Sequence, residues 1–377
     1  MAPSKRSAAQ PAGGACKRPA QAESSRPVGP PAPEAAPPAK GSGLEGSHEA
    51  VAAEEAREDA AAAFELFSRD LDDSAHGRMV ADEARTGAYE RAVARAVKGR
   101  AVLDVGTGPN ALLALLCARA GASRVIAVEV VPAAAELAKH AIAEAGFADT
   151  IEVIEGYSTA VELPRVDIVV HEIVGNLATE EGVAATLADL QARSQVVDSS
   201  QAGWSLPRRV ETLVAPVNLN VALPEVVAPE LPPNPAVRLP FAPPPATLLG
   251  DPQPFEVVDA EAPVVLQQAR VLHWRVRAAS RLSGFACAPR LELDGREEVS
   301  AWTARTHWSH ILVRLQRPTA VEAGDEVELT VHSDLRRFPV SHVFEAALLR
   351  HPAEGAGAGT PQTPRRRSLG RMEVQLQ

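Results

Sequence analysis

The sequence predicts an α/β domain built on a doubly wound, Rossmann-like parallel sheet, followed by an antiparallel β-barrel domain. Between residues 101 and 170, short β-branched runs alternate with Ala- and Leu-rich helical runs. This alternation is typical of right-handed βαβ units whose strands are buried on both faces. After residue 206 the helical runs give way to strand-like runs separated by turn residues, which indicates an antiparallel sandwich or barrel.

The individual elements follow from hydrophobic periodicity and from Pro and Gly boundaries. Helical patterns cover residues 49–71 and 79–97. The α/β part then predicts strand 101–105, helix 111–120, strand 124–128, helix 133–145 opened by Pro132, and strands 151–154 and 166–170. In the second part the expected strands cover residues 210–223, 264–276, 285–293, 310–315, 327–331 and 340–349.

Composition sets the expected domain boundaries. Residues 1–48 are rich in Ala, Pro, Gly and Ser without apolar periodicity, so we expect a disordered tail. The α/β domain with its N-terminal helices is expected at residues 49–206. The barrel domain is expected at residues 207–351, with a Pro-rich irregular segment at 224–263. Residues 352–377 are expected to form a second disordered tail.

Charge and cysteine usage restrict the function classes. The net charge is −10, from 38 basic and 48 acidic residues, which argues against a general nucleic-acid binder. Three scattered cysteines form no disulfide framework or metal-ligand spacing and favour a reducing compartment. No membrane span or secretory signal is expected. Lys5-Arg6 and Lys17-Arg18 loosely match a bipartite nuclear import signal, with an ordinary tail as the alternative, so we expect a cytoplasmic or nuclear protein.

A glycine-rich turn predicts a nucleotide-type cofactor pocket. Asp104-Val-Gly106-Thr-Gly108 follows a strand and precedes a helix, the context in which such a match is informative. Glycines at these positions let the backbone approach a ligand closely, and the helix N-terminus offers free N–H groups. Glu129 ends the next strand, where its carboxylate can accept hydrogen bonds from both ribose hydroxyls.

Two cofactors fit this turn. Gly106, Gly108 and Ala111 also match the dinucleotide fingerprint, so a nicotinamide site is the alternative. Asp104 favours S-adenosylmethionine, because a carboxylate would repel a pyrophosphate but attract the sulfonium end of the methyl donor.

Two carboxylates predict a second pocket beside the first. Glu172 closes the fourth strand, at the sheet edge where open α/β sheets bind ligands. Glu181 follows nine residues later, beyond a short loop. A loop that folds back would bring both carboxylates together, which suits a planar, permanently charged guanidinium. The alternative from spacing alone is two surface glutamates.

In combination these motifs resemble those of the protein arginine N-methyltransferases. The shared motifs, in the family's order, are a segment at 76–85 like the start of the cofactor-covering helix, the turn at 102–108, Val128-Glu129, the pair Glu172 and Glu181, and Thr306-His307-Trp308. The similarity runs from about residue 64 to residue 349. It implies a class I S-adenosylmethionine-dependent methyltransferase domain with a C-terminal β-barrel. The chain would be a divergent member, because Phe64 and Phe67 stand where the family has tyrosines.

The resemblance also implies roles for individual residues. Glu172 and Glu181 would hold the substrate guanidinium, and Asp82 would partner His307, which completes the expected catalytic set. Met79 and Trp308 would contact the substrate, and Arg85 would pair with the carboxylate of the methionyl group. The full expected cofactor-binding set is His76, Arg85, Asp104, Gly106, Gly108, Glu129 and Ser158, and no metal is expected.

The implied activity is transfer of a methyl group from S-adenosylmethionine to a guanidinium nitrogen of arginine in protein substrates, such as histones or Arg/Gly-rich proteins. Direct nucleic-acid and membrane partners are not expected. Two alternatives stay open: a methyltransferase for a different substrate, and a catalytically weak scaffold that keeps the fold. The family's helical dimerisation arm would fall in the Pro-rich stretch 223–245, where proline disfavours a helix interior. The usual head-to-tail dimer is therefore not expected, and the oligomeric state and the product type stay open.

Overall fold

The computed structural model describes residues 73–219, 236–239, 241–350 and 364–375, together with residues 54, 58, 59, 61, 62 and 65. All of these residues lie in one compact unit, Gly46–Gln377. The predicted tail 1–48, most of the predicted helix 49–71 and residues 220–235 lie outside the described residues. In the described part of the chain, no helix is long and apolar enough to cross a membrane.

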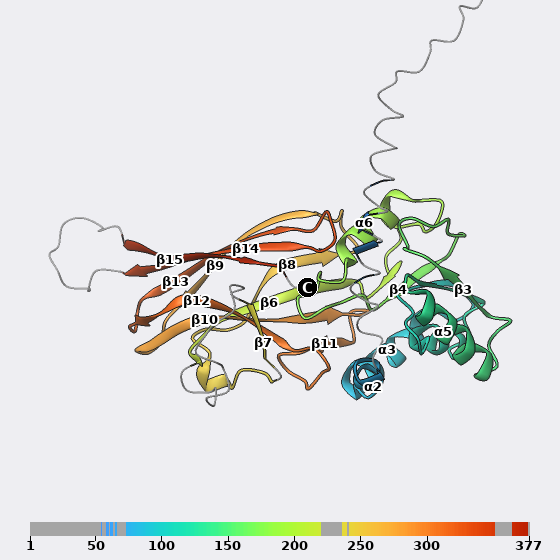
Figure 1. The fold of residues 1–377 in the computed structure, drawn as a ribbon, viewed down its shortest axis with the longest axis horizontal. Helices are drawn as coiled ribbons and strands as arrows, with labels where there is room; N and C mark the ends of the chain where they lie inside the picture. The colour runs from blue at the N-terminus through green and yellow to red at the C-terminus, as the bar shows by residue number, and fades with distance from the viewer. Residues whose placement is uncertain are drawn as a thin grey trace, which may run out of the picture. The chain divides into compact units, whose positions relative to one another are not determined.

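A parallel sheet forms the first part of the fold, as the alternating pattern predicts (Figure 1). Its strands are β1 (Ala101–Val105), β2 (Arg124–Glu129), β3 (Ile151–Glu155), β4 (Ile168–His171) and β5 (Ser205–Leu206), in the order β3-β2-β1-β4-β5. All neighbouring pairs are parallel. Because β1 lies between β2 and β4, the winding direction reverses there, and a ligand crevice is expected at the carboxyl ends of these strands.

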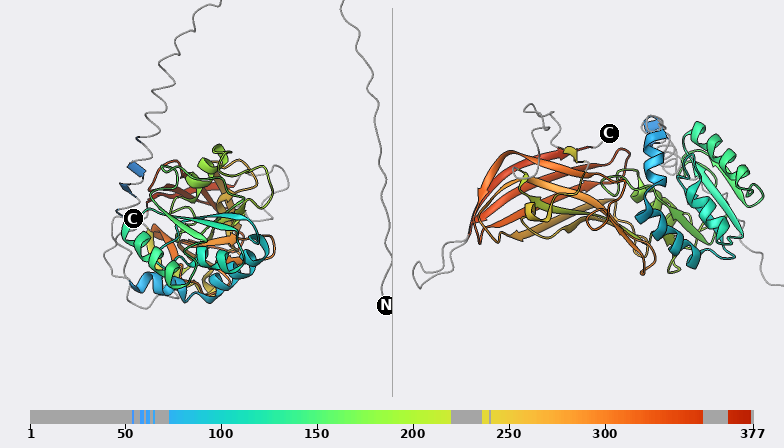
Figure 2. Two further views of the ribbon diagram at one scale, coloured as in Figure 1. Left: turned by 90° about the vertical axis from the view of Figure 1, so that its right-hand side faces the viewer. Right: turned by 90° about the horizontal axis from the view of Figure 1, so that it is seen from below.

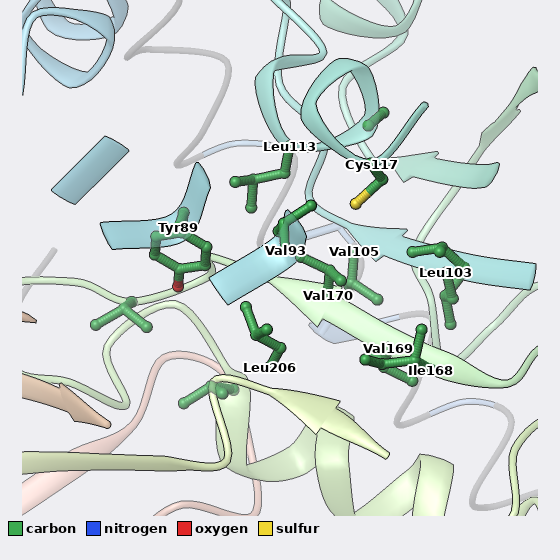
Figure 3. Packing of buried hydrophobic residues seen from close by; sticks show 14 of the residues in the cluster. Tyr89, Val93, Leu103, Val105, Leu113, Cys117, Ile168, Val169, Val170 and Leu206 are labelled. Atoms are coloured by element: carbon green, nitrogen blue, oxygen red, sulfur yellow. The ribbon is translucent and has the colours of Figure 1, made fainter. Parts of the chain in front are cut away.

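Five described helices accompany this sheet: α2 (Asp73–Val80), α3 (Glu83–Ala96), α4 (Leu112–Arg119), α5 (Pro132–Glu144) and α6 (Val183–Ala192). The bounds of α4 and α5 agree with the predicted helices to about one residue, whereas α6 was not predicted. Tyr89 and Val93 of α3 belong to the same buried cluster as Leu103 of β1 and Leu113 of α4 (Figure 3). The Tyr89 hydroxyl donates a 2.9 Å hydrogen bond to the carbonyl of His171. This bond fixes α3 to the end of β4, one residue before Glu172.

Two antiparallel sheets form the rest of the fold, and their strands run side by side in Figure 2. The strands are β6 (Arg209–Val217), β7 (Ala236–Leu239), β8 (Gln253–Asp259), β9 (Gln267–Arg275), β10 (Ser280–Glu292), β11 (Glu298–Ser300), β12 (His310–Val321), β13 (Glu326–Asp334), β14 (Ser341–Arg350) and β15 (Arg365–Val374). One sheet has the order β7-β12-β10-β6-β8, with β11 paired to β10, and the other has the order β15-β14-β13-β9. A shared apolar core joins the sheets, for example Phe255 and Phe285 from the first with Phe344 from the second. The antiparallel architecture predicted after residue 206 is thus confirmed.

Two stretches predicted to be irregular contain strands. The expected disordered tail 352–377 includes β15, which pairs with β14 and buries Met372 and Val374. The expected irregular segment 224–263 includes β7 and β8, and β8 buries Phe255 and Val258. The predictions for these residues are wrong because strand pairing and burial against a neighbouring sheet override a weak local signal.

Candidate active site

One cleft at the carboxyl ends of the parallel strands brings the two predicted pockets together. The residues that line it include Met79, Arg85, Gly106, Gly108, Glu129, Ser158, Glu172 and Glu181. These are eight of the thirteen site residues proposed from the sequence. The cleft therefore combines a glycine-rich turn and three separate carboxylates in one continuous wall.

The glycine-rich turn after β1 adopts a backbone that other residues would strain. Gly106 has a φ of +75°, and a Cβ added there would lie 2.6 Å from Cγ2 of Ile173. Gly108 has a φ of +63°, and a Cβ there would meet nothing within 4 Å. Glycine is the residue that adopts positive φ without steric cost. The turn is thus closely packed on one side and open at Gly108.

The Glu129 side chain accepts hydrogen bonds from two backbone N–H groups, one of them in this turn. Its Oε2 accepts a 2.9 Å hydrogen bond from the N–H of Gly108, and its Oε1 accepts one of 2.9 Å from the N–H of Val131. The segments that follow β1 and β2 therefore both hold this carboxylate at the edge of the cleft. Each carboxylate oxygen can accept more than one hydrogen bond, so further acceptor capacity remains.

Asp104 lies beneath the turn rather than on the cleft wall. It is completely buried and is not among the lining residues of the cleft. Thr107 Oγ1 donates a 2.6 Å hydrogen bond to its Oδ2. Burial raises the pKa of Asp104 to about 7, against the lowering effect of the bonds from Thr107 and the Ala114 backbone. The carboxyl thus braces the turn from inside, and its attraction to a sulfonium stays a prediction.

Arg85 and Glu172 form a buried ion pair at the other end of the cleft. The Arg85 guanidinium donates to Glu172 Oε2, and its Nη2 donates a 2.8 Å bond to the carbonyl of Met79. The two side chains are only 5% and 7% exposed. Glu172 Oε1 is buried and has no hydrogen-bond partner among the described residues. This oxygen can accept a donor that enters the cleft.

The loop between β4 and α6, residues 172–182, folds back so that Glu181 reaches the same cleft as Glu172. We call it the β4–α6 loop. Glu180 braces it from inside, since its Oε2 accepts a 2.8 Å bond from the N–H of Asn176 and its Oε1 lies 3.3 Å from Nη2 of Arg238 on β7. Gly175 is required for this packing, because a Cβ there would lie 2.5 Å from Glu180.

Residues 306–308 connect the antiparallel part to α3 and to the β4–α6 loop. Asp82 caps α3 through a 3.0 Å bond from the Arg85 N–H to Oδ1. Its Oδ2 accepts a 2.8 Å bond from the His307 N–H and lies 2.9 Å from His307 Nδ1. Trp308 Nε1 donates a 2.7 Å bond to the carbonyl of Val174. The Thr-His-Trp triplet thus touches the backbone of the loop that carries both glutamates.

Burial and hydrogen bonding act in opposite directions on Asp82. Burial raises the pKa of its carboxyl, but the hydrogen bonds from His307 and from the Arg85 backbone outweigh burial and leave the pKa below its ordinary value. Asp82 is therefore a carboxylate at neutral pH and an acceptor for the His307 ring.

Three further residues bear on the site: His76, Tyr157 and Glu180. His76 lies in α2, but its side chain is outside the described residues. Sequence reasoning missed two residues of the site: Glu180, and Tyr157, which lines the cleft and whose pKa burial raises to about 12. The nine-residue spacing from Glu172 favours Glu181, which is the glutamate that lines the cleft. No local sequence signal predicts the contacts of Glu180 with Asn176 and Arg238.

The chain is similar to known methyltransferases over this region. The family model for ribosomal protein L11 methyltransferase (PrmA) matches residues 88–189. Protein arginine N-methyltransferase 6 of Xenopus laevis is 33% identical over 158 residues, which is 41% of this chain and 45% of the relative. The arginine N(omega)-methyltransferase of Streptomyces achromogenes subsp. streptozoticus is 42% identical over 105 residues, 26% of this chain and 29% of the relative. The matches thus cover less than half the length of these relatives.

Solved structures extend the likeness to both parts of the fold. An open conformation of Arabidopsis thaliana protein arginine methyltransferase 10 has a TM-score of 0.62 at 20% identity, covering 79% of this chain and 96% of that one. The Trypanosoma brucei PRMT1 enzyme-prozyme heterotetrameric complex with AdoHcy has a TM-score of 0.60 at 18% identity, covering 79% and 97%. These structures support the fold, and the family model matches residues on both sides of the cleft, from α3 to α6. The resemblance seen in the motifs is therefore confirmed: the chain is similar to protein arginine N-methyltransferases over part of its sequence and in its fold.

Proposed function

We propose that this protein transfers a methyl group from S-adenosylmethionine to a guanidinium nitrogen of arginine in protein substrates. The observation that carries the proposal is that Glu172 and Glu181 line the same cleft as the glycine-rich turn and Glu129. A cofactor pocket and a cation pocket that share one wall suit a reaction between their two ligands.

The residues present fit the cofactor. Gly108 is open toward added atoms, Glu129 has spare acceptor capacity for ribose hydroxyls, and Arg85 is a cation on the cleft wall for the methionyl carboxylate. When bound, S-adenosylmethionine supplies an electrophilic methyl group on a sulfonium. The chain's own contribution is to orient the acceptor nitrogen toward it.

The two glutamates would prepare the substrate. An arginine guanidinium is protonated at any working pH and is a poor nucleophile. Carboxylates at Glu172 and Glu181 would bind it and concentrate its positive charge on one nitrogen, so that the other nitrogen points its electron pair at the methyl group. Most of the rate enhancement would come from alignment and electrostatic positioning. His307, held by Asp82, is a candidate acceptor of the released proton, and in the alternative it serves only to fix the two parts of the fold.

A second substrate form is supported by one comparison. The Streptomyces relative, 42% identical over its matched stretch, is named an arginine N(omega)-methyltransferase. Free arginine carries the same guanidinium as a protein side chain, so the two glutamates suit both forms. The substrate form is decided by comparing free L-arginine with an Arg/Gly-rich peptide at equal concentration.

The decisive experiment measures methyl transfer from labelled S-adenosylmethionine to that peptide, with its Lys-substituted version as the control. Transfer that requires arginine supports the proposal. Glu172→Gln and Glu181→Gln should each lower transfer by about 100-fold, equivalent to about 2.7 kcal/mol. Calorimetry of cofactor binding on each variant reports whether the fold and the cofactor site survive. Intact cofactor binding without transfer to any arginine substrate would refute the activity and favour the scaffold alternative.

A further inference from the structure

A buried carboxylate in the antiparallel part contacts the β4–α6 loop. Glu256 on β8 is 0% exposed. Its Oε2 accepts a 2.8 Å hydrogen bond from the hydroxyl of Thr179, and its Oε1 accepts one of 3.3 Å from the N–H of Thr179. Thr179 lies in the loop, two residues before Glu181. Glu256, which lies outside the cleft, therefore forms hydrogen bonds to the loop that carries Glu181.

Thr212 extends this contact to the preceding residue of the loop. The Thr212 hydroxyl donates to Glu256 Oε1 and accepts a 2.7 Å bond from the N–H of Ala178. Thr179 and Thr212 are both completely buried. Glu256 thus accepts the N–H of Thr179 directly, and it is connected to the N–H of Ala178 through the Thr212 hydroxyl.

The chemistry of the cluster explains why a carboxylate is present in an apolar interior. A buried backbone N–H without an acceptor costs free energy, and an apolar side chain at position 256 would leave the Thr179 N–H in that state. In the described part of the chain, the only cation-forming side chain within 4 Å of Glu256 is His342, whose Nε2 lies 3.7 Å away. The carboxylate is therefore stabilised mainly by donors from Thr179 and Thr212.

We propose that Glu256 is a positioning residue for the substrate: it fixes Ala178 and Thr179 so that Glu181 is held in the cleft opposite Glu172. The substrate part of this inference rests on the proposed function. Other contacts of this loop are those of Trp308 with the carbonyl of Val174 and of Arg238 with Glu180. Glu256 is the contact that acts on Ala178 and Thr179, so its loss loosens this part of the loop without touching the cofactor turn.

The test uses conservative pairs and one matched control. Glu256→Met removes both acceptor oxygens at similar volume, whereas Glu256→Gln keeps one carbonyl oxygen for the Thr179 N–H. Thr212→Val removes the hydroxyl, whereas Thr212→Ser keeps it. This second pair tests the same contact if Glu256→Met does not fold. Glu211→Met is the control, because Glu211 is a buried glutamate on β6 whose oxygens bond to Arg209 and Arg290.

The first measurement is hydrogen exchange of the ligand-free protein, which does not depend on any activity. Amides of residues 173–182 should exchange at least tenfold faster in Glu256→Met and Thr212→Val, because each substitution leaves one buried backbone N–H of the loop without its acceptor. Glu256→Gln, Thr212→Ser and Glu211→Met should exchange like the wild type. Equal exchange in Glu256→Met and Glu211→Met, together with unchanged exchange in Thr212→Val, overturns the inference.

The second measurement separates the substrate from the cofactor. The KM for an arginine peptide should rise about tenfold in Glu256→Met, with the cofactor Kd unchanged and with recovery in Glu256→Gln. Faster loop exchange with an unchanged KM, or an equal loss of cofactor affinity, overturns the positioning role. If the wild type methylates no arginine substrate, the proposed function fails, while the exchange comparison still decides whether Glu256 holds the loop.

Discussion

The contact between Asp82 and His307 should be a measurable link between the α/β part and the antiparallel part. Asp82 precedes α3, and His307 lies 225 residues later in the loop before β12. The carboxylate contacts the His307 ring at 2.9 Å, the His307 N–H at 2.8 Å and the Arg85 N–H at 3.0 Å. A double-mutant cycle with Asp82→Ala, His307→Ala and the combined variant isolates the ring–carboxylate interaction.

The three contacts set the expected magnitudes. A hydrogen bond to a charged group contributes about 1.5–3 kcal/mol, so the coupling free energy should be about 2 kcal/mol. Asp82→Ala also removes the helix cap, worth about 1 kcal/mol, and the acceptor of the His307 N–H. It should therefore destabilise the protein more than His307→Ala. Because the hydrogen bonds from His307 and from the Arg85 backbone lower the pKa of Asp82, the carboxylate's contribution to stability is present above the ordinary aspartate pKa and is lost as the pH falls through the lowered value.

Urea denaturation at pH 7 measures the coupling, followed by tryptophan fluorescence and by circular dichroism so that two-state behaviour is tested. Asp82→Asn is the control for the cap, because it keeps an acceptor for the Arg85 N–H while it removes the charge. A coupling free energy below about 0.5 kcal/mol, the usual limit for additive sites, would refute the assignment of this pair as a link.

Three further predictions concern other parts of the chain. Burial lowers the pKa of His310 to about 4, so its contribution to stability is present above pH 6.5 and is lost as the pH falls toward 4. In urea titrations, His310→Gln should remove about 3 kcal/mol of this pH dependence. An equal dependence of the unfolding free energy on pH in both proteins would contradict this. Gly106→Ala should weaken cofactor binding by tenfold or more, and more than Gly108→Ala in calorimetry, because the added Cβ would lie 2.6 Å from Ile173. Truncation after residue 363 removes β15 and should cost about 3 kcal/mol or more of apolar burial; an unchanged melting temperature would show that β15 does not support the sheet.

Much of the cofactor side was predictable from the sequence because of one geometric rule. The carboxyl ends of parallel strands meet at a single edge, so Gly106, Glu129 and Glu172, each at a predicted strand end, had to lie near one another. The cleft contains all three. Local patterns sufficed here because each residue is adjacent to a strong β-branched run, whose place in the sheet follows from the crossover rule.

The parts that were missed depend on contacts between distant segments. Glu256 sits in the run Pro-Phe-Glu-Val-Val, where alternation alone would place a glutamate toward solvent, yet its donors come from residues 179 and 212. The orientation of such a buried carboxylate is determined by packing between distant strands, which composition and spacing do not encode.

Helix α3 is the element that relates these observations to one another. Asp82, Arg85 and Tyr89 are separated by three and four residues, which places them along one side of the helix. Each of the three contacts a different part of the site: Asp82 contacts His307, Arg85 contacts Glu172, and Tyr89 bonds the backbone at the end of β4. Breaking a buried ion pair on one side leaves an uncompensated charge, so the Arg85 contact restrains Glu172 strongly. One helical face therefore orients both Glu172 and the loop from the antiparallel part, although these lie far apart in the sequence.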